Sequence, residues 1–259
     1  MLEAAELASE KLRQLGDEGK KYSGIGASGD VSLVGDRISE ESIINYLKDS
    51  LDSFVIVSEE KGFLKVGKGE KQKYFIIDPI DGSNNYRIGL SPYTISIAVS
   101  SSRFMNDIYS GIVYDISTGR YFWAEKNNGA YFLKNRIYTC KYEKKPYVIS
   151  INFSNSEAGR LASSLKEYLK NNIKIRSLGS ASWEACLVAN NVLDAFIEAW
   201  NHLRVIDIAA ASIILKESNT SFRFSLKEKD KNLEISFDKR ISLLAFTSQK
   251  LMQIILSLL

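Results

Sequence analysis

Asp78 and Asp81 stand at the end of an apolar segment, in the stretch FIIDPIDGSNNY (residues 75–86). Carboxylates repel one another and are costly to desolvate, so this pattern calls for a positive partner. The kink at Pro79 lets both carboxylates and the Ile80 carbonyl face one volume. Oxygen ligands without histidine or thiolate favour Mg²⁺ or Mn²⁺ over Zn²⁺. The segment therefore predicts a site for one or two such cations.

The residues after Asp81 form a polar stretch, Gly82-Ser83-Asn84-Asn85, which reads as a loop entering a helix. Free backbone N–H groups at a helix start seat phosphate oxygens. The segment therefore points to a cation that faces a bound phosphate. Taken alone, Asp-Pro-x-Asp-Gly is also an ordinary turn composition, so this interpretation depends on what else lies nearby.

Acidic residues also mark two further apolar segments. Glu59 and Glu60 close the strand expected over 54–60, and Asp207 lies near the start of the apolar helix expected over 205–218. Each has a plain structural explanation, as a solvated strand end or a carboxylate in the first turn of a helix. Asp and Glu are seldom buried without partners, so the joint pattern favours metal chemistry with oxygen ligands.

Composition excludes several classes of function. The 259 residues carry a net charge of +3, from 34 basic and 31 acidic residues, which is too balanced to indicate nucleic acid or a membrane surface as a partner. No apolar run reaches the roughly 18 residues that span a bilayer. Cys140 and Cys186 show no metal-ligand spacing, and His202 is the single histidine. Because the first 20 residues read as an amphipathic helix and not as a secretory signal, we expect a cytoplasmic protein.

Hydrophobic patterning predicts a strand-rich first half, residues 1–139, and a second half, residues 140–259, that alternates helices and strands. We expect the halves to form one catalytic unit. A loop or loose hairpin is expected over 21–36 and a charged loop over 61–72. The expected helices cover 1–20, 39–51, 155–172, 180–191, 205–218 and 248–259. The expected strands cover 54–60, 74–78, 93–101, 108–115, 120–126, 130–138, 173–179, 193–200, 221–226, 233–238 and 241–246.

Taken together, these segments resemble the inositol monophosphatase family, which includes archaeal fructose-1,6-bisphosphatases and bisphosphate nucleotidases. FIIDPIDGSNNY is similar to the first signature of the family, and LRVIDIAAASIILKES (203–218) to the second. VSEEKG (57–62), GASGDVSLVGDRISEESI (26–43) and SLGSASWEACLVANNVLDAFIEAW (177–200) resemble other conserved family segments in the expected order. Two correctly spaced signatures are specific, and the resemblance covers nearly the whole chain.

The resemblance implies a role for each matched residue. Two or three Mg²⁺ ions, with Mn²⁺ as an alternative, would be held by Glu59, Asp78, the Ile80 carbonyl, Asp81 and Asp207. Glu59 bridges metals in the family, so it is also counted as catalytic.

For the phosphate and the attacking water, the resemblance implies further roles. Gly82 and Ser83 would give backbone N–H groups to the phosphate. The Ser83 hydroxyl, paired with Asp36, would orient a metal-bound water.

Substrate contacts are implied for Glu198 and for the turn formed by Gly179, Ser180 and Ala181. Arg176 and Arg204 are candidate contacts to a substrate phosphate. For Arg176 the alternative is an ordinary surface arginine, and for Arg204 it is a salt bridge with a nearby acid.

Three departures from the family pattern stand out. Ile206 occupies the position of the tryptophan that usually precedes the second-signature aspartate, and residues 217–220 replace a usual glycine pair. Ser83 stands where threonine is common, and it keeps the hydroxyl. Since no metal carboxylate is missing, we expect an active enzyme.

The resemblance implies an α/β (α+β) fold, a layered α/β/α/β/α sandwich, and a homodimer. We expect Mg²⁺-dependent hydrolysis of a phosphate monoester on a small sugar or polyol. The segments GIGASGD and LRVIDIAAA resemble those of archaeal family members. This resemblance favours inositol 1-phosphate and fructose 1,6-bisphosphate as substrates. A nucleotidase acting on 3′-phosphoadenosine compounds and a non-catalytic module that binds metal or phosphate are the alternatives.

Overall fold

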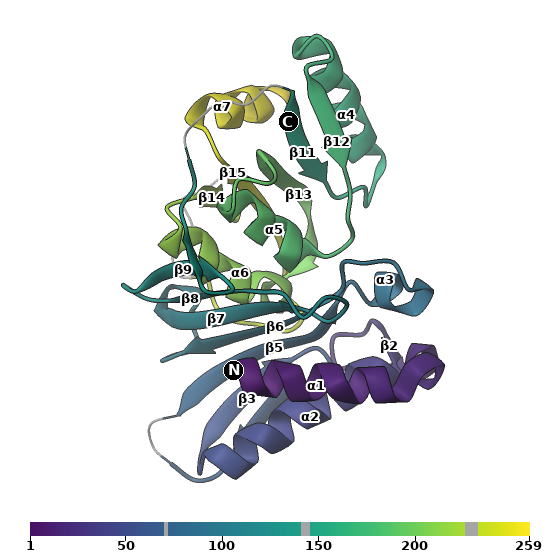
Figure 1. Ribbon diagram of the computed structural model, residues 1–259, viewed down its shortest axis with the longest axis vertical. Coiled ribbons are helices and arrows are strands. Elements are labelled where there is room, and N and C mark those ends of the chain that lie inside the picture. The colour runs from purple at the N-terminus through teal and green to yellow at the C-terminus, as the bar shows by residue number, and fades with distance from the viewer. Residues whose placement is uncertain (70–71, 141–145, 226–232) are drawn as a thin grey trace.

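The computed structural model describes residues 1–69, 72–140, 146–225 and 233–259. Within these ranges the helices and sheets stack in alternating layers, which run from α1 and α2 at the bottom of Figure 1 to α4 and α7 at the top. Two sheets lie between, with α5 and α6 sandwiched by them. The α/β/α/β/α arrangement expected from the sequence is therefore confirmed.

The first sheet contains eight strands in the described part of the chain, in the order β10-β9-β8-β7-β6-β5-β3-β4. Its pairings are antiparallel except that of β3 with β5, which is parallel. Its strands are β3 (Phe54–Ser58), β4 (Gly62–Val66), β5 (Lys73–Asp81), β6 (Thr94–Ser100), β7 (Ile108–Asp115), β8 (Tyr121–Glu125), β9 (Gly129–Phe132) and β10 (Asn135–Ile137).

Two long helices cover the outer face of this sheet. They are α1 (Leu2–Leu15), which buries Ala4, Ala5, Ala8 and Leu12, and α2 (Val34–Ser50). The apolar stripe on each helix packs against the sheet, as amphipathic spacing requires. The connection between the two helices contains the short helix η1 (Gly16–Lys20) and the hairpin of β1 (Tyr22–Ile25) with β2 (Val31–Leu33).

The inner helical layer consists of α5 (Ala181–Ala189) and α6 (Val205–Glu217). Every residue of α6 from Val205 to Leu215 is buried, because both sheets pack on it. A helix that is apolar on all sides belongs in such an interior. This double burial makes α6 a fixed support for the polar residues at its first turn.

The second sheet contains five strands in the described ranges, in the order β12-β11-β13-β15-β14, and α4 with α7 cover its outer face. Its strands are β11 (Tyr147–Ile151), β12 (Ile173–Arg176), β13 (Ala195–Arg204), β14 (Ser221–Arg223) and β15 (Arg240–Phe246). The helices are α4 (Ser156–Tyr168) and α7 (Gln249–Leu258), and the remaining short elements are α3 (Ser83–Ile88) and η2 (Met105–Asp107).

Several local predictions were wrong. Residues 62–66 form the edge strand β4 inside the predicted loop 61–72, because pairing with the buried strand β3 outweighs a charged composition. Residues 233–238 form no regular strand and show only a bridge between Glu234 and Phe104. Strand β11 was not predicted, and α2 begins at Val34. Residues 70–71 of the predicted loop and residue 226 of a predicted strand lie outside the described residues.

The helices in the described ranges were compared with the length and apolar composition of a membrane span. None of the helices there combines the length and the apolar composition needed to cross a bilayer. The predicted division of the chain into residues 1–139 and 140–259 stays a prediction, although the two sheets lie on either side of that boundary.

Tight contact between α6 and β7 leads to a stability prediction. A Cβ atom at Gly111 would lie 2.7 Å from Cγ2 of Ile213 and 3.0 Å from Cα of Ala210. We expect Gly111→Ala to lower the free energy of unfolding by roughly 1–3 kcal/mol, since the core must shift to admit the methyl group. Urea denaturation measures this change.

The matched control is Gly159→Ala in α4, where an added Cβ meets nothing within 4 Å. This variant should gain roughly 0.4–1 kcal/mol, because alanine reduces the entropy of the unfolded chain. Equal effects at Gly111 and Gly159 would contradict the close packing of α6 on the sheet.

Candidate active site

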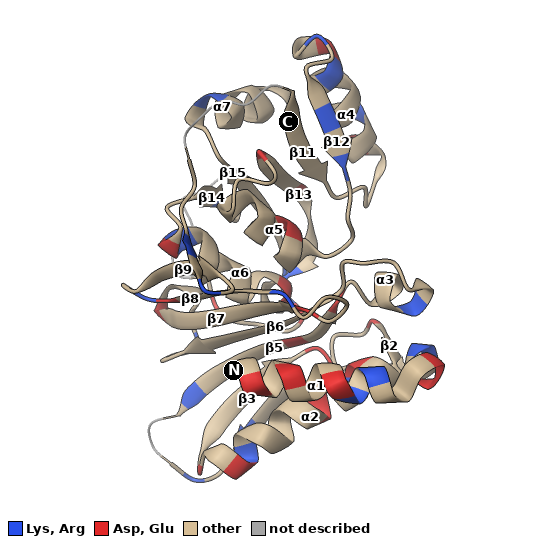
Figure 2. Cartoon of the chain, viewed as in Figure 1, with Lys and Arg blue, Asp and Glu red and all other residues tan. Residues whose placement is uncertain are grey.

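Strand order brings separate acidic segments to one place. Since β3 and β5 are parallel neighbours, Glu59 follows β3 at the same sheet edge where Asp78 and Asp81 end β5. The pairing of β5 with β6 shifts register between Asp78 and Asp81. Asp207 comes from the first turn of α6, which packs on β5. Figure 2 shows acidic positions at the end of β5 and the start of α6, where the halves of the chain meet.

Burial dominates the electrostatics of this acidic cluster, which we define as Glu59, Asp78, Asp81 and Asp207. All four residues are buried, and Asp78 is only 1% exposed. Burial, followed by the charges of Glu59, Asp207 and Asp81, raises the pKa of Asp78 well above its ordinary value. Burial also raises the pKa of Glu59 and of Asp81.

Asp78 has a fully buried oxygen without a hydrogen-bond partner among the described residues. Oδ1 of Asp78 is buried and accepts no hydrogen bond from any of the described residues. A buried carboxylate oxygen in this position requires a cation or a donor. The oxygen-only donor set and this unpartnered atom therefore fit Mg²⁺.

Arg204 lies among these carboxylates. Its Nε donates to Oδ1 of Asp207 at 2.9 Å, and its Nη1 forms an ion pair with Glu59. The backbone N–H of Arg204 donates to the other oxygen of Asp207 at 2.8 Å. Burial lowers the pKa of Arg204, but Asp207 and Glu59 outweigh it and raise that pKa above its ordinary value. The predicted salt bridge is therefore present, and a contact with substrate stays a prediction.

Asp81 faces the start of α5 in the second half of the chain. Its carboxylate accepts hydrogen bonds from Oγ of Ser180 at 2.8 Å, from N of Ala181 at 3.2 Å and from N of Ser182 at 2.7 Å. The Ser182 hydroxyl also donates to it. A carboxylate here satisfies free N–H groups and suits the positive end of the helix.

The side chains of the acidic cluster are not arranged as a complete metal coordination sphere. Within the described ranges, no three His, Cys, Asp or Glu side chains converge closely enough to hold a metal ion. Arg204 and the start of α5 contact several of the carboxylate oxygens. The fold thus brings the predicted metal ligands into one region, and their role as ligands stays a prediction. These groups are Glu59, Asp78, the Ile80 carbonyl, Asp81 and Asp207.

The structure pairs Ser83 with Asp36, as the sequence predicted. The Ser83 hydroxyl lies 3.2 Å from Oδ1 of Asp36 and 2.8 Å from the Ile80 carbonyl oxygen. The other oxygen of Asp36 accepts from N of Leu33 at 2.8 Å. Burial raises the pKa of Asp36 to about 7, and Glu59 adds to this effect. Asp36 can therefore exchange a proton near neutral pH.

The turn before α5 approaches the first half of the chain closely. A Cβ at Gly82, whose φ is +91°, would lie 2.8 Å from the Gly179 carbonyl oxygen. Nδ2 of Asn85 donates to the Leu178 carbonyl at 2.6 Å and to the Pro92 carbonyl at 2.8 Å. Because glycine alone fits this approach, the spacing between Gly82 and Gly179 is set by backbone contact.

Two predicted substrate residues are not directed into an open site. Glu198 is fully buried, and its Oε1 accepts from N of Trp200 at 2.9 Å. Its Oε2 has no partner in the described part of the chain. Arg176 is exposed and donates to the Ile175 carbonyl. Substrate contact by either residue stays a prediction.

A model of the Inositol monophosphatase family matches residues 2–229. The chain belongs to this family. Its named relatives include phosphatases, so the chain is an enzyme of that class. The resemblance seen in the two signature segments is therefore confirmed.

Individual relatives agree with this family membership. A fructose-1,6-bisphosphatase/inositol-1-monophosphatase from Methanocaldococcus jannaschii is 31% identical over 262 residues, which cover 99% of this chain and 96% of the relative. A bifunctional NADP phosphatase/NAD kinase from Methanococcus maripaludis is 30% identical over 85% of this chain, which spans only 41% of that relative. A solved inositol monophosphatase–fructose 1,6-bisphosphatase has a TM-score of 0.84 at 28% identity, covering 99% of this chain and 97% of its own.

The sequence analysis missed two buried glutamates, Glu184 and Glu40, that bind backbone N–H groups next to the predicted site residues. Oε1 of Glu184 accepts from N of Leu178 at 2.9 Å, and its Oε2 accepts from N of Gly179 at 3.2 Å. Oε1 of Glu40 accepts from N of Glu60 at 3.2 Å and from N of Lys61 at 3.3 Å. Both carboxylates are buried in helices, where the only sequence signal is an acid on an otherwise apolar face.

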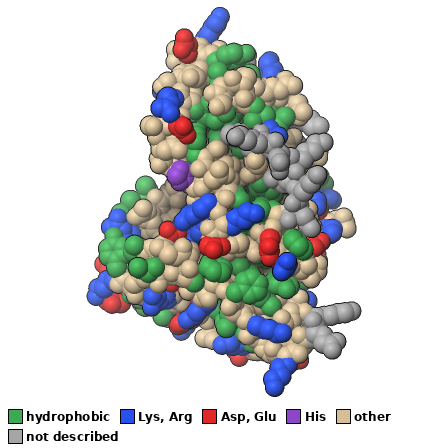
Figure 3. Space-filling view, turned by 180° about the vertical axis from the view of Figure 1, so that it is seen from behind, with side chains coloured by type: hydrophobic (Ala, Val, Ile, Leu, Met, Phe, Trp, Pro, Cys, Tyr) green, Lys and Arg blue, Asp and Glu red, His purple; other side chains and the backbone are tan. Residues whose placement is uncertain are grey.

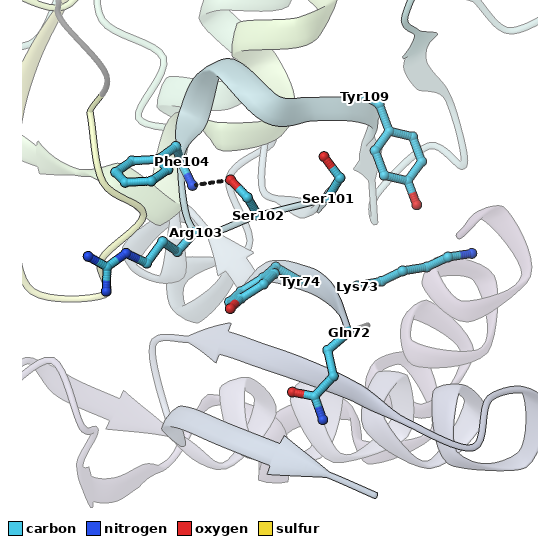
Figure 4. A pocket seen from close by; sticks show the side chains of 8 residues that line it. All are labelled: Gln72, Lys73, Tyr74, Ser101, Ser102, Arg103, Phe104 and Tyr109. Carbon is cyan, nitrogen blue, oxygen red and sulfur yellow. Dashed lines mark hydrogen bonds between the residues drawn. The ribbon is translucent and has the colours of Figure 1, made fainter. Parts of the chain in front are cut away.

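A separate pocket of about 820 Å³ lies near the start of β5, at the opposite end of that strand from Asp81. Figure 4 shows that the Lys73 and Arg103 side chains at this pocket point in opposite directions. Arg103 reaches Glu234, with 3.4 Å between the charged atoms. Because the two cations do not converge on one anion, we do not assign the phosphate site to this pocket.

The buried carboxyl of Glu40 leads to a prediction about pH. Burial raises its folded-state pKa from 4.5 to about 7. The folded state therefore holds a proton that the unfolded chain releases between these values. Without divalent metal, this group should reduce the free energy of unfolding by on the order of 3 kcal/mol as the pH rises from about 4.5 to about 7.

Urea denaturation in EDTA at pH 5 and pH 8 measures this loss in wild type and in Glu40→Gln. The variant should lose less stability over this interval, because its amide does not titrate. Glu41→Gln, at an exposed position on the same helix, is the control and should behave like wild type. An identical loss in wild type and Glu40→Gln would show that Glu40 is ionised in the fold.

Proposed function

We propose that the chain is a Mg²⁺-dependent phosphate monoester hydrolase that acts on a small phosphorylated sugar or polyol. The observation that carries this proposal is the buried acidic cluster, of which Asp78, Asp81 and Asp207 lie in the two family signatures. Oδ1 of Asp78 has no hydrogen-bond partner among the described residues. Such a cluster is costly to maintain unless a cation is part of the working state. Archaeal relatives that carry fructose-1,6-bisphosphatase and inositol-1-monophosphatase in their names support the substrate class.

The residues that would hold the ions are those of the acidic cluster together with the Ile80 carbonyl. When bound, Mg²⁺ lowers the pKa of water and neutralises charge on a phosphoryl group. The Ile80 carbonyl oxygen lies 2.8 Å from the Ser83 hydroxyl oxygen. The number of ions and the use of Mn²⁺ stay predictions.

In this proposal, Ser83 and Asp36 handle the proton of the attacking water. The Ser83 hydroxyl lies between the Ile80 carbonyl and Oδ1 of Asp36, within hydrogen-bond distance of both. Oδ1 of Asp36, which lies 3.2 Å from the Ser83 hydroxyl, is the proton acceptor of this pair. Backbone N–H groups of Gly82 and Ser83, at the start of α3, bind the phosphate.

Recognition of the substrate would fall to the second half of the chain. The turn of Gly179, Ser180 and Ala181 meets Gly82 across the boundary between the halves, so it lies next to the phosphate-binding loop. Glu198 would accept hydrogen bonds from substrate hydroxyl groups through Oε2, which requires its pocket to open. Arg176 would reach a second phosphate from the surface. The homodimer and the cytoplasmic location stay predictions.

A substrate panel is the direct test. Phosphate release with Mg²⁺ is measured as kcat/KM for inositol 1-phosphate, fructose 1,6-bisphosphate, 3′-phosphoadenosine 5′-phosphate and NADP, the last because of the bifunctional relative. We expect the sugar and polyol phosphates to be preferred. Preference for the adenosine compound would favour the nucleotidase alternative, and absence of turnover with retained Mg²⁺ binding would favour a non-catalytic module.

Metal binding should stabilise the fold. At a Mg²⁺ concentration 100 times its Kd, the free energy of unfolding should rise by about 2.7 kcal/mol, because the ion binds only the folded cluster. For a chain of this size the melting temperature should rise by roughly 5–10 °C. Asp81→Asn should lose most of this rise, together with the activity.

The control for this experiment is Asp17→Asn, the same change at an exposed position. It should keep the full rise in melting temperature. If Asp81→Asn also keeps the full rise, Asp81 is not a metal ligand.

Removing the Ser83 hydroxyl should slow the chemical step. We expect Ser83→Ala to reduce kcat roughly 30- to 1000-fold, equivalent to about 2–4 kcal/mol, with a smaller change in KM. Ser83→Thr keeps the hydroxyl and should stay within about tenfold of wild type. Steady-state kinetics at saturating Mg²⁺ compares the variants, and a change in KM alone for Ser83→Ala would contradict the assigned role.

A further inference from the structure

Arg204 occupies the space between two of the predicted metal ligands. Its Nε bonds to Asp207 and its Nη1 to Glu59, and the side chain is only 11% exposed. We propose that Arg204 is a built-in counter-cation of the acidic cluster, which Mg²⁺ displaces from Glu59 and Asp207 when it binds. This inference rests on the proposed function, because it requires the cluster to bind metal.

The contacts of Arg204 with Glu59 and Asp207 support competition with Mg²⁺ and not joint occupancy. With its carboxylates ionised, the acidic cluster carries four negative charges, and Arg204 supplies a single positive charge in contact with two of them. A guanidinium and Mg²⁺ repel each other and would need the same carboxylate oxygens. Mg²⁺ therefore replaces the Arg204 guanidinium at Glu59 and Asp207. Because this contact must break first, Arg204 lowers the apparent affinity of the cluster for Mg²⁺.

A second acidic partner for the Arg204 guanidinium lies close by, at Asp30. Nη1 also lies 3.2 Å from Oγ of Ser28 and 3.3 Å from Oδ2 of Asp30. The Asp30 side chain is 45% exposed, whereas those of Glu59 and Asp207 are 9% exposed. By turning toward Asp30, the guanidinium can leave the buried carboxylates and keep an ion pair near the surface.

Arg240 is a neighbouring cation that shares Asp30 with Arg204 and serves as a control for the loss of one positive charge. Its Nη2 pairs with Oδ2 of Asp30 at 2.8 Å, and its Nη1 donates to the His202 carbonyl. The structure gives it no contact with Glu59 or Asp207, and its side chain is 42% exposed. Figure 3 shows cationic and anionic side chains side by side across the middle of this molecule's far face. Removing Arg240 thus changes the local charge without touching the acidic cluster.

Isothermal titration with Mg²⁺ in the absence of substrate tests the proposal. Arg204→Met should lower the Kd for Mg²⁺ by about tenfold or more, because no guanidinium has to leave. The same variant should melt at a lower temperature in EDTA. Arg204→Lys, which keeps the charge but loses the two-pronged contact, should fall between wild type and Arg204→Met, and Arg240→Met should stay within about twofold of wild type.

A second measurement on the wild-type protein remains decisive if Arg204→Met fails to fold without metal. Arginine side-chain NMR follows the Nε–H of Arg204, identified by its absence in Arg204→Lys. This proton should exchange slowly in EDTA and much faster at saturating Mg²⁺. Unchanged protection on adding Mg²⁺ would overturn the proposal.

The remaining outcomes separate this inference from the proposed function. If wild type and Arg204→Met bind Mg²⁺ with the same Kd, the cluster holds metal and only the role of Arg204 is wrong. If neither binds Mg²⁺, the proposed function fails and this inference fails with it. Equal tightening in Arg204→Met and Arg240→Met would reduce the effect to general charge, which also overturns the proposal.

Discussion

The burial of the acidic cluster between the two sheets is the constraint on which the rest of the structure depends. Carboxylates lose their hydration there and repel one another, so each needs a partner. Arg204 satisfies Glu59 and Asp207, while the start of α5 satisfies Asp81. Asp78 has an oxygen with no such partner among the described residues. The unequal distribution of partners marks Asp78 as the carboxylate that gains most when a metal ion binds.

The same constraint ties the two halves of the chain together. Asp81 ends a strand of the first sheet, yet its hydrogen bonds come from Ser180, Ala181 and Ser182. The Thr94 hydroxyl lies within 3.1 Å of the Ser180 hydroxyl and 3.0 Å of the Ser182 hydroxyl, which continues this polar contact into β6. Because the acidic residues come from both halves, neither half contains the site by itself. Polar contacts thus specify how the inner helices sit on the first sheet.

Local sequence patterns predicted the elements that tertiary contacts do not override. Alternation and β-branched content located β6 and β7, and the wholly apolar composition of 205–218 located α6. They failed at β4, where an edge strand pairs through its backbone inside a lysine-rich segment predicted as a loop. They also failed at 233–238, where a strand-like alternation forms only one bridge. At β4 the neighbouring strand β3 decided the outcome, and local composition does not reveal that neighbour.

By itself, the sequence determined the family, and through that resemblance it predicted the pairing of Ser83 with Asp36, because both depend on residue types in a recognised order. The oxygen-only metal chemistry stays a prediction from the sequence. The tertiary structure decided the partner of each charge. Oδ1 of Asp207 meets the Arg204 guanidinium, and Asp81 faces a helix that starts 100 residues later. Glu40 and Glu184 became visible as supports only through their backbone partners. Electrostatic energy depends on distance and burial, and both are properties of the folded chain.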